Sequence, residues 1–219
     1  MPQSSTGGRG AGRPRDAVLS RERILDAAYA LAQDPGTDFT LAALARRLDV
    51  RPSAIHHYFP GKDALITEMR GHLTRRLGRH GFDEIPWYEA IMPWARAYRD
   101  ALGSHPGIIA ALATLPVAAE PESIADYERI VGAFARAGFP EHRIVPALVA
   151  IESFIIGSSL DALAPHDNLR PDGDAAPALE RAERRSREDA AARGTDVATS
   201  AFEFGLAALV AGLREAGRR

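Results

Sequence analysis

Residues 40–62 read TLAALARRLDVRPSAIHHYFPGK, and this pattern predicts two short helices joined by a tight turn. Thr40 stands just before the first helix, where its hydroxyl can accept a backbone N–H as an N-cap. The apolar residues that follow share one helix face: Leu41, Leu44, Ala45 and Leu48. Asp49 suits the turn because Asp tolerates a left-handed backbone, and Pro52 suits the first position of the next helix. We therefore expect a helix-turn-helix.

The second helix of this pair has a composition that suits contact with DNA. Ile55 and Phe59 are four residues apart and can face the core together. The other side chains are small, hydrogen-bonding or aromatic, which fits the major groove of a duplex. They are Ser53, Ala54, His56, His57 and Tyr58.

Lys62 is the single lysine in a chain that carries 27 Lys and Arg residues. It stands at the start of a further helix, where a cation opposes the helix dipole unless an anion occupies the site. Because helix N-termini bind phosphate, Lys62 is expected to contact the DNA backbone. The alternative is an ordinary lysine on a solvated turn.

Residues 21–66 resemble the DNA-binding domain of the TetR (tetracycline repressor) family of bacterial regulators. The resemblance is carried by the spacing of Ile24, Leu25, Ala28 and Leu31, by FTLAALARRLDV at 39–50, and by AIHHYFPGKDAL at 54–65. The chain departs from the family at Arg51, where a serine cap is usual, and at Asp49, where glycine is common. The resemblance implies an all-α protein that binds DNA through Thr40, Ser53, His56, Tyr58 and Lys62. The chemistry of the residues themselves adds Arg51, Ala54 and His57 as expected contacts.

The charge distribution agrees with a polyanionic partner at the N-terminal end. Residues 1–80 carry 13 basic and 8 acidic side chains, whereas residues 81–219 carry 14 and 21, so a net charge of −2 conceals a basic front on an acidic body. Residues 1–19 form a basic arm that includes Arg9, Arg13 and Arg15. Such an arm can enter a narrow minor groove, or it can act as a solubilising tail.

Beyond residue 62 the chain is predicted to be helical almost throughout. Helices are expected near 63–79, from 86 through at least 98, and near 122–137, 141–163 and 196–213, with a short apolar piece at 106–116. Ile124 is expected among the inward residues of the helix at 122–137. Residues 178–194, ALERAERRSREDAAARG, are either a charged helix or a disordered segment. We divide the chain into the arm at 1–19, the helix-turn-helix domain at 20–66, and a helical effector-binding and dimerisation domain at 67–219.

Two segments predict a homodimer. The helix at 141–163 is apolar around most of its circumference, and one core can cover only part of it. The resemblance implies an interface formed by residues 141–163 and 196–214 of both chains. The alternative is a central core helix in a monomer. Two copies would present two recognition helices to half-sites of a palindromic operator about 34 Å apart.

The larger domain is expected to bind a small-molecule effector. Aromatic side chains with a few polar groups suit a mostly apolar ligand, although aromatics at helical spacing usually pack a core. The residues proposed for the site are Trp87, Trp94, Tyr98, Tyr127, Phe134, Glu152 and Phe154. The proposed function is a DNA-binding repressor released from its operator by this effector.

Other classes of function have less support. His56 and His57 face different sides of a helix and lack the spacing of a metal pair. The sequence contains no phosphate loop, nucleophile elbow or cofactor motif. We therefore expect neither an enzyme nor a cofactor. The two histidines could still make a pH-sensitive DNA contact.

The chain has no cysteine and no signal-peptide pattern, which is compatible with the cytoplasm. The longest uncharged apolar stretch, 108–119, is short, so no membrane span is expected. The alternative function is a helical adaptor that binds protein.

Overall fold

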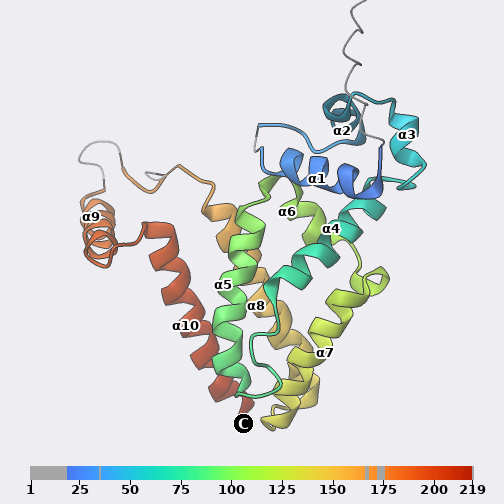
Figure 1. Ribbon diagram of the computed structural model, residues 1–219. Helices are drawn as coiled ribbons and strands as arrows, with labels where there is room; N and C mark the ends of the chain where they lie inside the picture. The colour runs from blue at the N-terminus through green and yellow to red at the C-terminus, as the bar shows by residue number, and fades with distance from the viewer. Residues whose placement is uncertain (1–18, 35, 166–167, 172–175, 219) are drawn as a thin grey trace, which may run out of the picture.

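The computed structural model describes residues 19–34, 36–165, 168–171 and 176–218, and within these ranges the chain is helical with no strand. An N-terminal unit, residues 19–61, lies on top of an elongated helical body (Figure 1). The N-terminal helices are α1 (Arg21–Ala32), α2 (Leu41–Leu48) and α3 (Pro52–His56). The helices that follow are α4 (Lys62–Leu77), α5 (Trp87–Gly103), α6 (Ile109–Thr114), α7 (Pro121–Arg136), α8 (Glu141–Asp161), α9 (Pro177–Ala192) and α10 (Val197–Gly217).

The predicted helix-turn-helix is confirmed residue by residue. The Thr40 hydroxyl accepts the Ala43 backbone N–H at 3.1 Å, so α2 has the expected N-cap. Asp49 adopts the left-handed conformation, with φ 55° and ψ 45°, and ends α2. Pro52 is the first residue of α3. The turn therefore forms from local chemistry at these positions.

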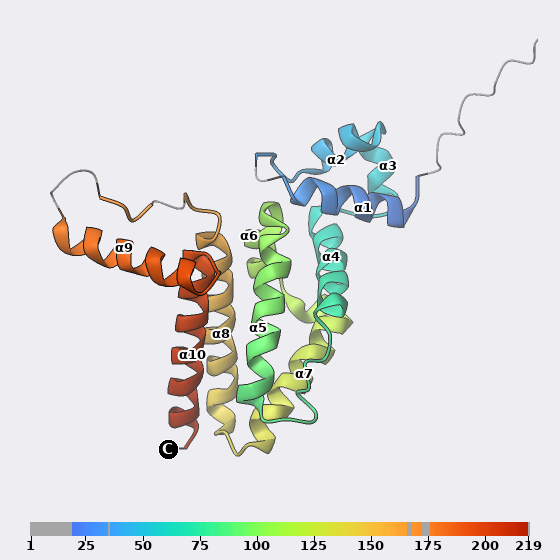
Figure 2. The ribbon, with the colours of Figure 1, turned by 60° about the vertical axis from the view of Figure 1, so that its left-hand side comes forward.

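The connector α4 descends from the N-terminal unit into the body, so the predicted division between residues 66 and 67 falls inside one continuous helix (Figure 1). Its buried face includes Leu65, Ile66 and Met69, each fully inaccessible to solvent. In the body, α5, α8 and α10 lie side by side, and α7 covers another side of α5 and α8 (Figure 2). Two short 3-10 turns, Pro106–Ile108 and Val117–Ala119, flank α6.

Three features of the body could be settled only from the structure. Residues 177–192 form the helix α9, which runs away from the body across the upper end of α10, so the charged-helix alternative is the observed one (Figure 2). Helix α5 continues through Pro93. The inward placement of Ile124 was wrong: this side chain is 49% exposed because Ser123 and Asp126 occupy the buried face of α7 there.

The prediction that no helix spans a membrane rests on the uncharged stretches of the sequence, whereas two apolar helices of the structure are longer than these stretches. By length and composition alone, α8 and α10 are each long and apolar enough to cross one, with mean hydropathies of 1.6 and 1.3. These helices remain apolar on average despite a few charged residues. In this structure α8 packs between α5 and α10.

Candidate nucleic-acid interface and buried cavity

Helix α3 presents a polar face to solvent and an apolar side to the core. Ile55 and Phe59 are fully buried, as their spacing predicted. Ser53, His56 and His57 are exposed, and Ala54 is half-buried. This division leaves the hydrogen-bonding side chains of α3 free to meet a ligand as large as a duplex.

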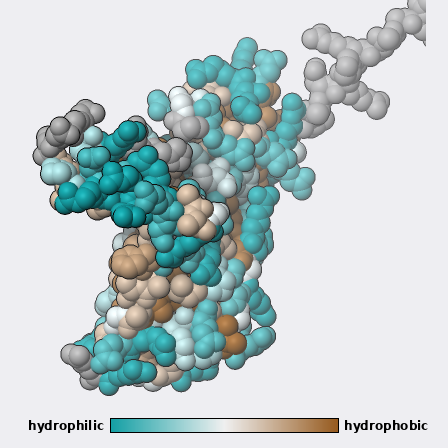
Figure 3. Space-filling model, turned by 90° about the vertical axis from the view of Figure 1, so that its left-hand side faces the viewer, coloured by the Kyte–Doolittle hydropathy of each residue, from teal (hydrophilic) through white to brown (hydrophobic). Residues whose placement is uncertain are grey.

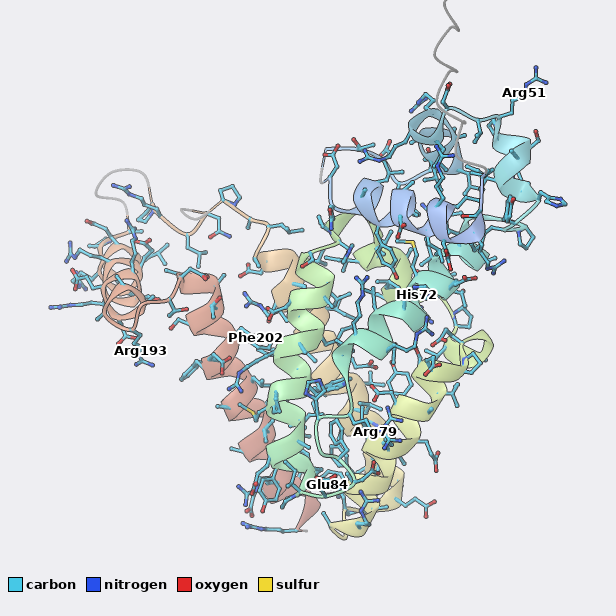
Figure 4. The ribbon with its side chains drawn as sticks, viewed as in Figure 1. Arg51, His72, Arg79, Glu84, Arg193 and Phe202 are labelled. Atoms are coloured by element: carbon cyan, nitrogen blue, oxygen red, sulfur yellow. The ribbon has the colours of Figure 1, made fainter. Side chains whose placement is uncertain are left out.

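Two cations stand at the ends of this polar face. Arg51 precedes α3, makes no side-chain cap hydrogen bond, and points away from the protein (Figure 4). Lys62 is exposed in the first turn of α4, with its Nζ 5.6 Å from the centroid of the Phe39 ring. Gly61 is the N-cap of α4 and offers no capping side chain, so first-turn backbone N–H groups remain available to an anion.

Thr40 and Tyr58 each make a hydrogen bond within the protein, and Thr40, which only accepts one, keeps its hydroxyl hydrogen for a further acceptor. The Thr40 hydroxyl caps α2, and the Tyr58 hydroxyl donates to the Leu19 carbonyl oxygen at 2.6 Å. Arg21 completes the junction because its Nη1 donates to the Tyr58 carbonyl oxygen at 2.9 Å. The same guanidinium lies 4.4 Å from the centroid of the Phe59 ring and forms an ion pair with Glu68 of α4. Sequence reasoning missed Arg21, because Glu68 is 47 residues away.

A narrow cavity lies in the body between α4, α5, α6 and α7, with a free volume of about 30 Å³. Three of the aromatic residues proposed for the effector line it, namely Trp94, Tyr98 and Tyr127. The other lining residues were not foreseen: Arg70, Leu73, Thr74, Leu77, Leu112, Ser123 and Asp126. The cavity therefore has aromatic walls interrupted by charged and hydroxyl groups.

The polar groups around the cavity are tied into hydrogen bonds. The Trp94 indole N–H donates to the Asp126 carboxylate at 3.0 Å, and Arg129 donates to the same carboxylate at 2.8 Å. Tyr127 donates its hydroxyl to Glu152 of α8. Burial raises the pKa of the Glu152 carboxyl above its ordinary value. Burial, followed by the nearby Glu152 charge, also raises the pKa of the Tyr98 and Tyr127 hydroxyls.

The remaining aromatic residues proposed for the effector lie elsewhere. The Trp87 and Phe134 rings stack on one another with centroids 4.1 Å apart in the core of the body. Phe154 stacks on Phe202, with centroids 5.6 Å apart, in the seam between α8 and α10. Phe202 points from α10 toward the body (Figure 4). These three side chains pack the fold rather than line the cavity.

An apolar surface runs along α8 and α10. Val145 and Val149 on α8 are 61% and 53% exposed, and Phe204 on α10 is 80% exposed. Apolar side chains gather over α10 below α9, framed by hydrophilic ones (Figure 3). The helix predicted to be apolar all round therefore leaves part of its circumference, at Val145 and Val149, exposed within a single chain.

Comparison with known proteins agrees with this geometry. Residues 24–69 match the family model "Bacterial regulatory proteins, tetR family", and residues 83–216 match "Tetracyclin repressor-like, C-terminal domain". Over 62 residues the chain is 44% identical to the HTH-type transcriptional regulator BetI of Brucella canis, a match that covers 28% of this chain and 31% of that relative. The chain thus spans less than a third of the length of this curated relative.

Solved structures extend the likeness to the whole fold. A possible TetR family transcriptional regulator from Streptomyces coelicolor is 28% identical with a TM-score of 0.74, covering 90% of this chain and 99% of that one. BioQ of Mycobacterium smegmatis is 27% identical with a TM-score of 0.65, covering 91% and 100%. A further structure shows BioQ with its double-stranded DNA operator, at 25% identity and a TM-score of 0.62, covering 90% and 98%.

The all-helical fold, with an N-terminal helix-turn-helix on a helical body, defines a class of bacterial DNA-binding regulators. The chain belongs to the tetR family of that class.

Proposed function

We propose that this chain is a transcriptional repressor that binds operator DNA as a homodimer and releases it when a small molecule binds the body. The observation that carries the proposal is the exposed face of α3, where Ser53, His56 and His57 lie between the cations Arg51 and Lys62. The hydrogen-bonding side chains would read base edges, and the cations would contact phosphates. The ring of Tyr58 and the backbone near Thr40 and Ala54 would lie against the duplex. Such a regulator acts in the cytoplasm, where bacterial DNA lies.

The proposed dimer joins α8 and α10 of two chains, within residues 141–163 and 196–214. Support comes from the exposed apolar side chains on both helices, because contiguous apolar surface of this kind marks an interaction site. A two-fold dimer would place two copies of α3 on half-sites of a palindromic operator about 34 Å apart.

The proposed effector site is the cavity lined by Trp94, Tyr98 and Tyr127, with Glu152 behind Tyr127. Its walls favour a small, flat, mostly apolar molecule that carries polar atoms for the charged groups. Trp87, Phe134 and Phe154 would act through packing. Because the free volume is about 30 Å³, a ligand larger than a few atoms requires the walls to move apart.

The test is a measurement of binding to duplex DNA as salt is raised. A regulator that contacts phosphates loses affinity with a log–log slope of about −0.9 per contact, whereas an adaptor that binds protein has no measurable hold on DNA. Fragments selected from the source genome then supply the operator. With that operator, His57→Ala is expected to change the preferred base at one position. A variant with unchanged preference would remove His57 from the reading face.

A further inference from the structure

One turn of α4 contacts the N-terminal unit and also forms part of the wall of the cavity. Glu68 forms the ion pair with Arg21, which in turn donates to the carbonyl of Tyr58 after α3. At the next residue, Met69, the backbone carbonyl oxygen accepts a hydrogen bond from the Tyr29 hydroxyl of α1 at 2.8 Å. The residue after that, Arg70, reaches in the opposite direction, into the body. Consecutive residues of α4 therefore contact α1 of the N-terminal unit and the cavity.

Arg70 is a buried cation, 8% exposed, that binds the end of α6. Its Nη2 donates to the carbonyl oxygens of Leu112 at 2.7 Å and Leu115 at 2.9 Å, and its Nη1 donates to that of Pro116 at 3.1 Å. The last carbonyls of a helix have no partner within the helix, so the guanidinium satisfies groups that would otherwise be unpaired. These bonds fasten α4 to the C-terminal end of α6.

Neighbouring contacts extend this attachment along the same segment. Gly71 has no room for a side chain, because a Cβ there would lie 2.7 Å from the carboxyl carbon of Glu120. The Glu120 carboxylate in turn caps the first turn of α7. The Thr74 and Ser123 hydroxyls are 3.0 Å apart. Residues 112–123 thus contact residues 70–74 of α4, which make up about one helical turn.

Arg70 also lines the cavity. Three of its five N–H donors are occupied by the carbonyls, so two remain without a partner among the described residues. A ligand that presents oxygen acceptors at this point can compete for the whole guanidinium, since a planar donor group binds such oxygens in a bidentate manner.

We propose that Arg70 couples the cavity to the N-terminal unit: a ligand with acceptor oxygens withdraws the guanidinium from α6 and frees α4 to tilt. Glu68 then carries the tilt through Arg21 to Tyr58 after α3, and Met69 carries it through Tyr29 to α1. This inference rests on the proposed function. It names Arg70 as a positioning residue and oxygen-bearing molecules as the effector class.

The test removes the attachment without a ligand. Arg70→Met keeps an apolar stem but donates no hydrogen bond, so it should reproduce the ligand-bound arrangement. Operator affinity is expected to fall by about fivefold or more, the range of allosteric coupling. Arg75→Met is the matched control. It also removes a cation from α4, and the ion pair that Arg75 forms with Glu122 is half exposed. The control should change affinity by less than about twofold.

A second readout separates coupling from loss of stability. The chain has no cysteine, so Ser53→Cys places one spin label on α3 and Glu128→Cys places one on the exposed side of α7. In the dimer, Arg70→Met should change the distance between labels at position 53 and leave the distance at position 128 unchanged. A purely structural role would lower the melting temperature and shift neither distance.

Two outcomes distinguish the failure of this inference from the failure of the proposed function. A folded, dimeric Arg70→Met with wild-type affinity and wild-type distances would overturn the coupling role. A wild-type chain that binds no duplex would overturn the proposed function instead. If Arg70→Met does not fold, Arg70→Lys replaces it, because an ammonium keeps the charge but lacks the planar geometry needed for the three carbonyls. Unchanged distances in Arg70→Lys would then contradict the proposal.

Discussion

The Tyr58 hydroxyl donates to the Leu19 carbonyl oxygen at 2.6 Å. This bond joins the segment that follows α3 to the segment that precedes α1. Arg21 returns the contact by donating to the Tyr58 carbonyl. The segment after α3 is thus held by Leu19, just before α1, and by Arg21 in the first turn of α1. Because the hydroxyl donates its one hydrogen to Leu19, it has none to donate to a phosphate, and the bond orients the end of α3.

Tyr58→Phe is expected to lower the free energy of unfolding by about 1 kcal/mol, the usual net contribution of one such hydrogen bond. Chemical denaturation measures the change. Tyr88→Phe is the control, because the described residues offer the Tyr88 hydroxyl no hydrogen bond and its loss should have a smaller effect. The preferred operator should stay the same in both variants. A new base preference in Tyr58→Phe would mean that the hydroxyl reads DNA.

Lys62→Ala is expected to weaken binding to all duplexes alike. Loss of one phosphate contact lowers the magnitude of the log–log salt slope by about 0.9, without favouring any sequence. Anisotropy titrations at several salt concentrations measure the slope. Arg79→Ala removes a cation beyond the other end of α4, far from α3, and should leave the slope unchanged (Figure 4). Equal slopes in Lys62→Ala and the wild type would remove Lys62 from the interface.

The helix-turn-helix could be predicted from sequence because its determinants are local. A cap at Thr40, a left-handed residue at Asp49 and a proline at the start of α3 each act on the backbone within a few positions. The spacing of Ile55 and Phe59 fixes which side of α3 is buried. None of these features depends on the rest of the chain.

The cavity could be predicted only in part, because its walls come from four helices. Periodicity marks Trp87 and Trp94 alike as apolar positions of α5, yet Trp87 stacks in the core and Trp94 reaches the cavity. Arg70 resembles any other arginine in the sequence, and its burial follows from the carbonyls of α6, which are 42 or more residues away. Helix packing decides such positions, and sequence spacing does not reveal it.

Glu152→Gln is expected to stabilise the protein at about pH 7. Burial raises the pKa of the Glu152 carboxyl in the folded state, so ionisation is less favourable there than in the unfolded chain. The native state is therefore favoured while the group is protonated, and it loses stability as the pH rises through the folded-state pKa. A glutamine can still accept the Tyr127 hydroxyl and has no charge to bury.

The difference between the two chains should shrink as the pH falls from about 7 to about 4, where glutamate in an unfolded chain becomes protonated. Unfolding free energies at the two pH values measure it. Glu128→Gln, an exposed substitution on α7, controls for the change of net charge. A pH-independent difference between wild type and Glu152→Gln would exclude titration of this carboxyl as the cause.

Phe204→Glu tests the proposed dimer more directly than a change at Phe154. The Phe154 ring stacks on Phe202 within one chain, and a Cβ at Gly205 would lie 2.6 Å from it, so a charge at Phe154 would disturb the fold itself. Phe204 is 80% exposed and can be replaced without loss of a core contact. A glutamate there would place a charge inside the proposed α8–α10 interface, where desolvation without a partner is unfavourable.

Phe204→Glu is therefore expected to sediment as a monomer, to unfold much as an isolated wild-type chain does, and to bind a palindromic operator far more weakly. The loss follows because a monomer engages one half-site and forfeits the effective concentration of the second. Ile124→Glu is the control, since Ile124 is also apolar and 49% exposed but lies on α7. Analytical ultracentrifugation separates the two variants. If Phe204→Glu remains a dimer with full operator affinity while Ile124→Glu dissociates, the interface lies on α7, and the exposed face of α8 and α10 has another role.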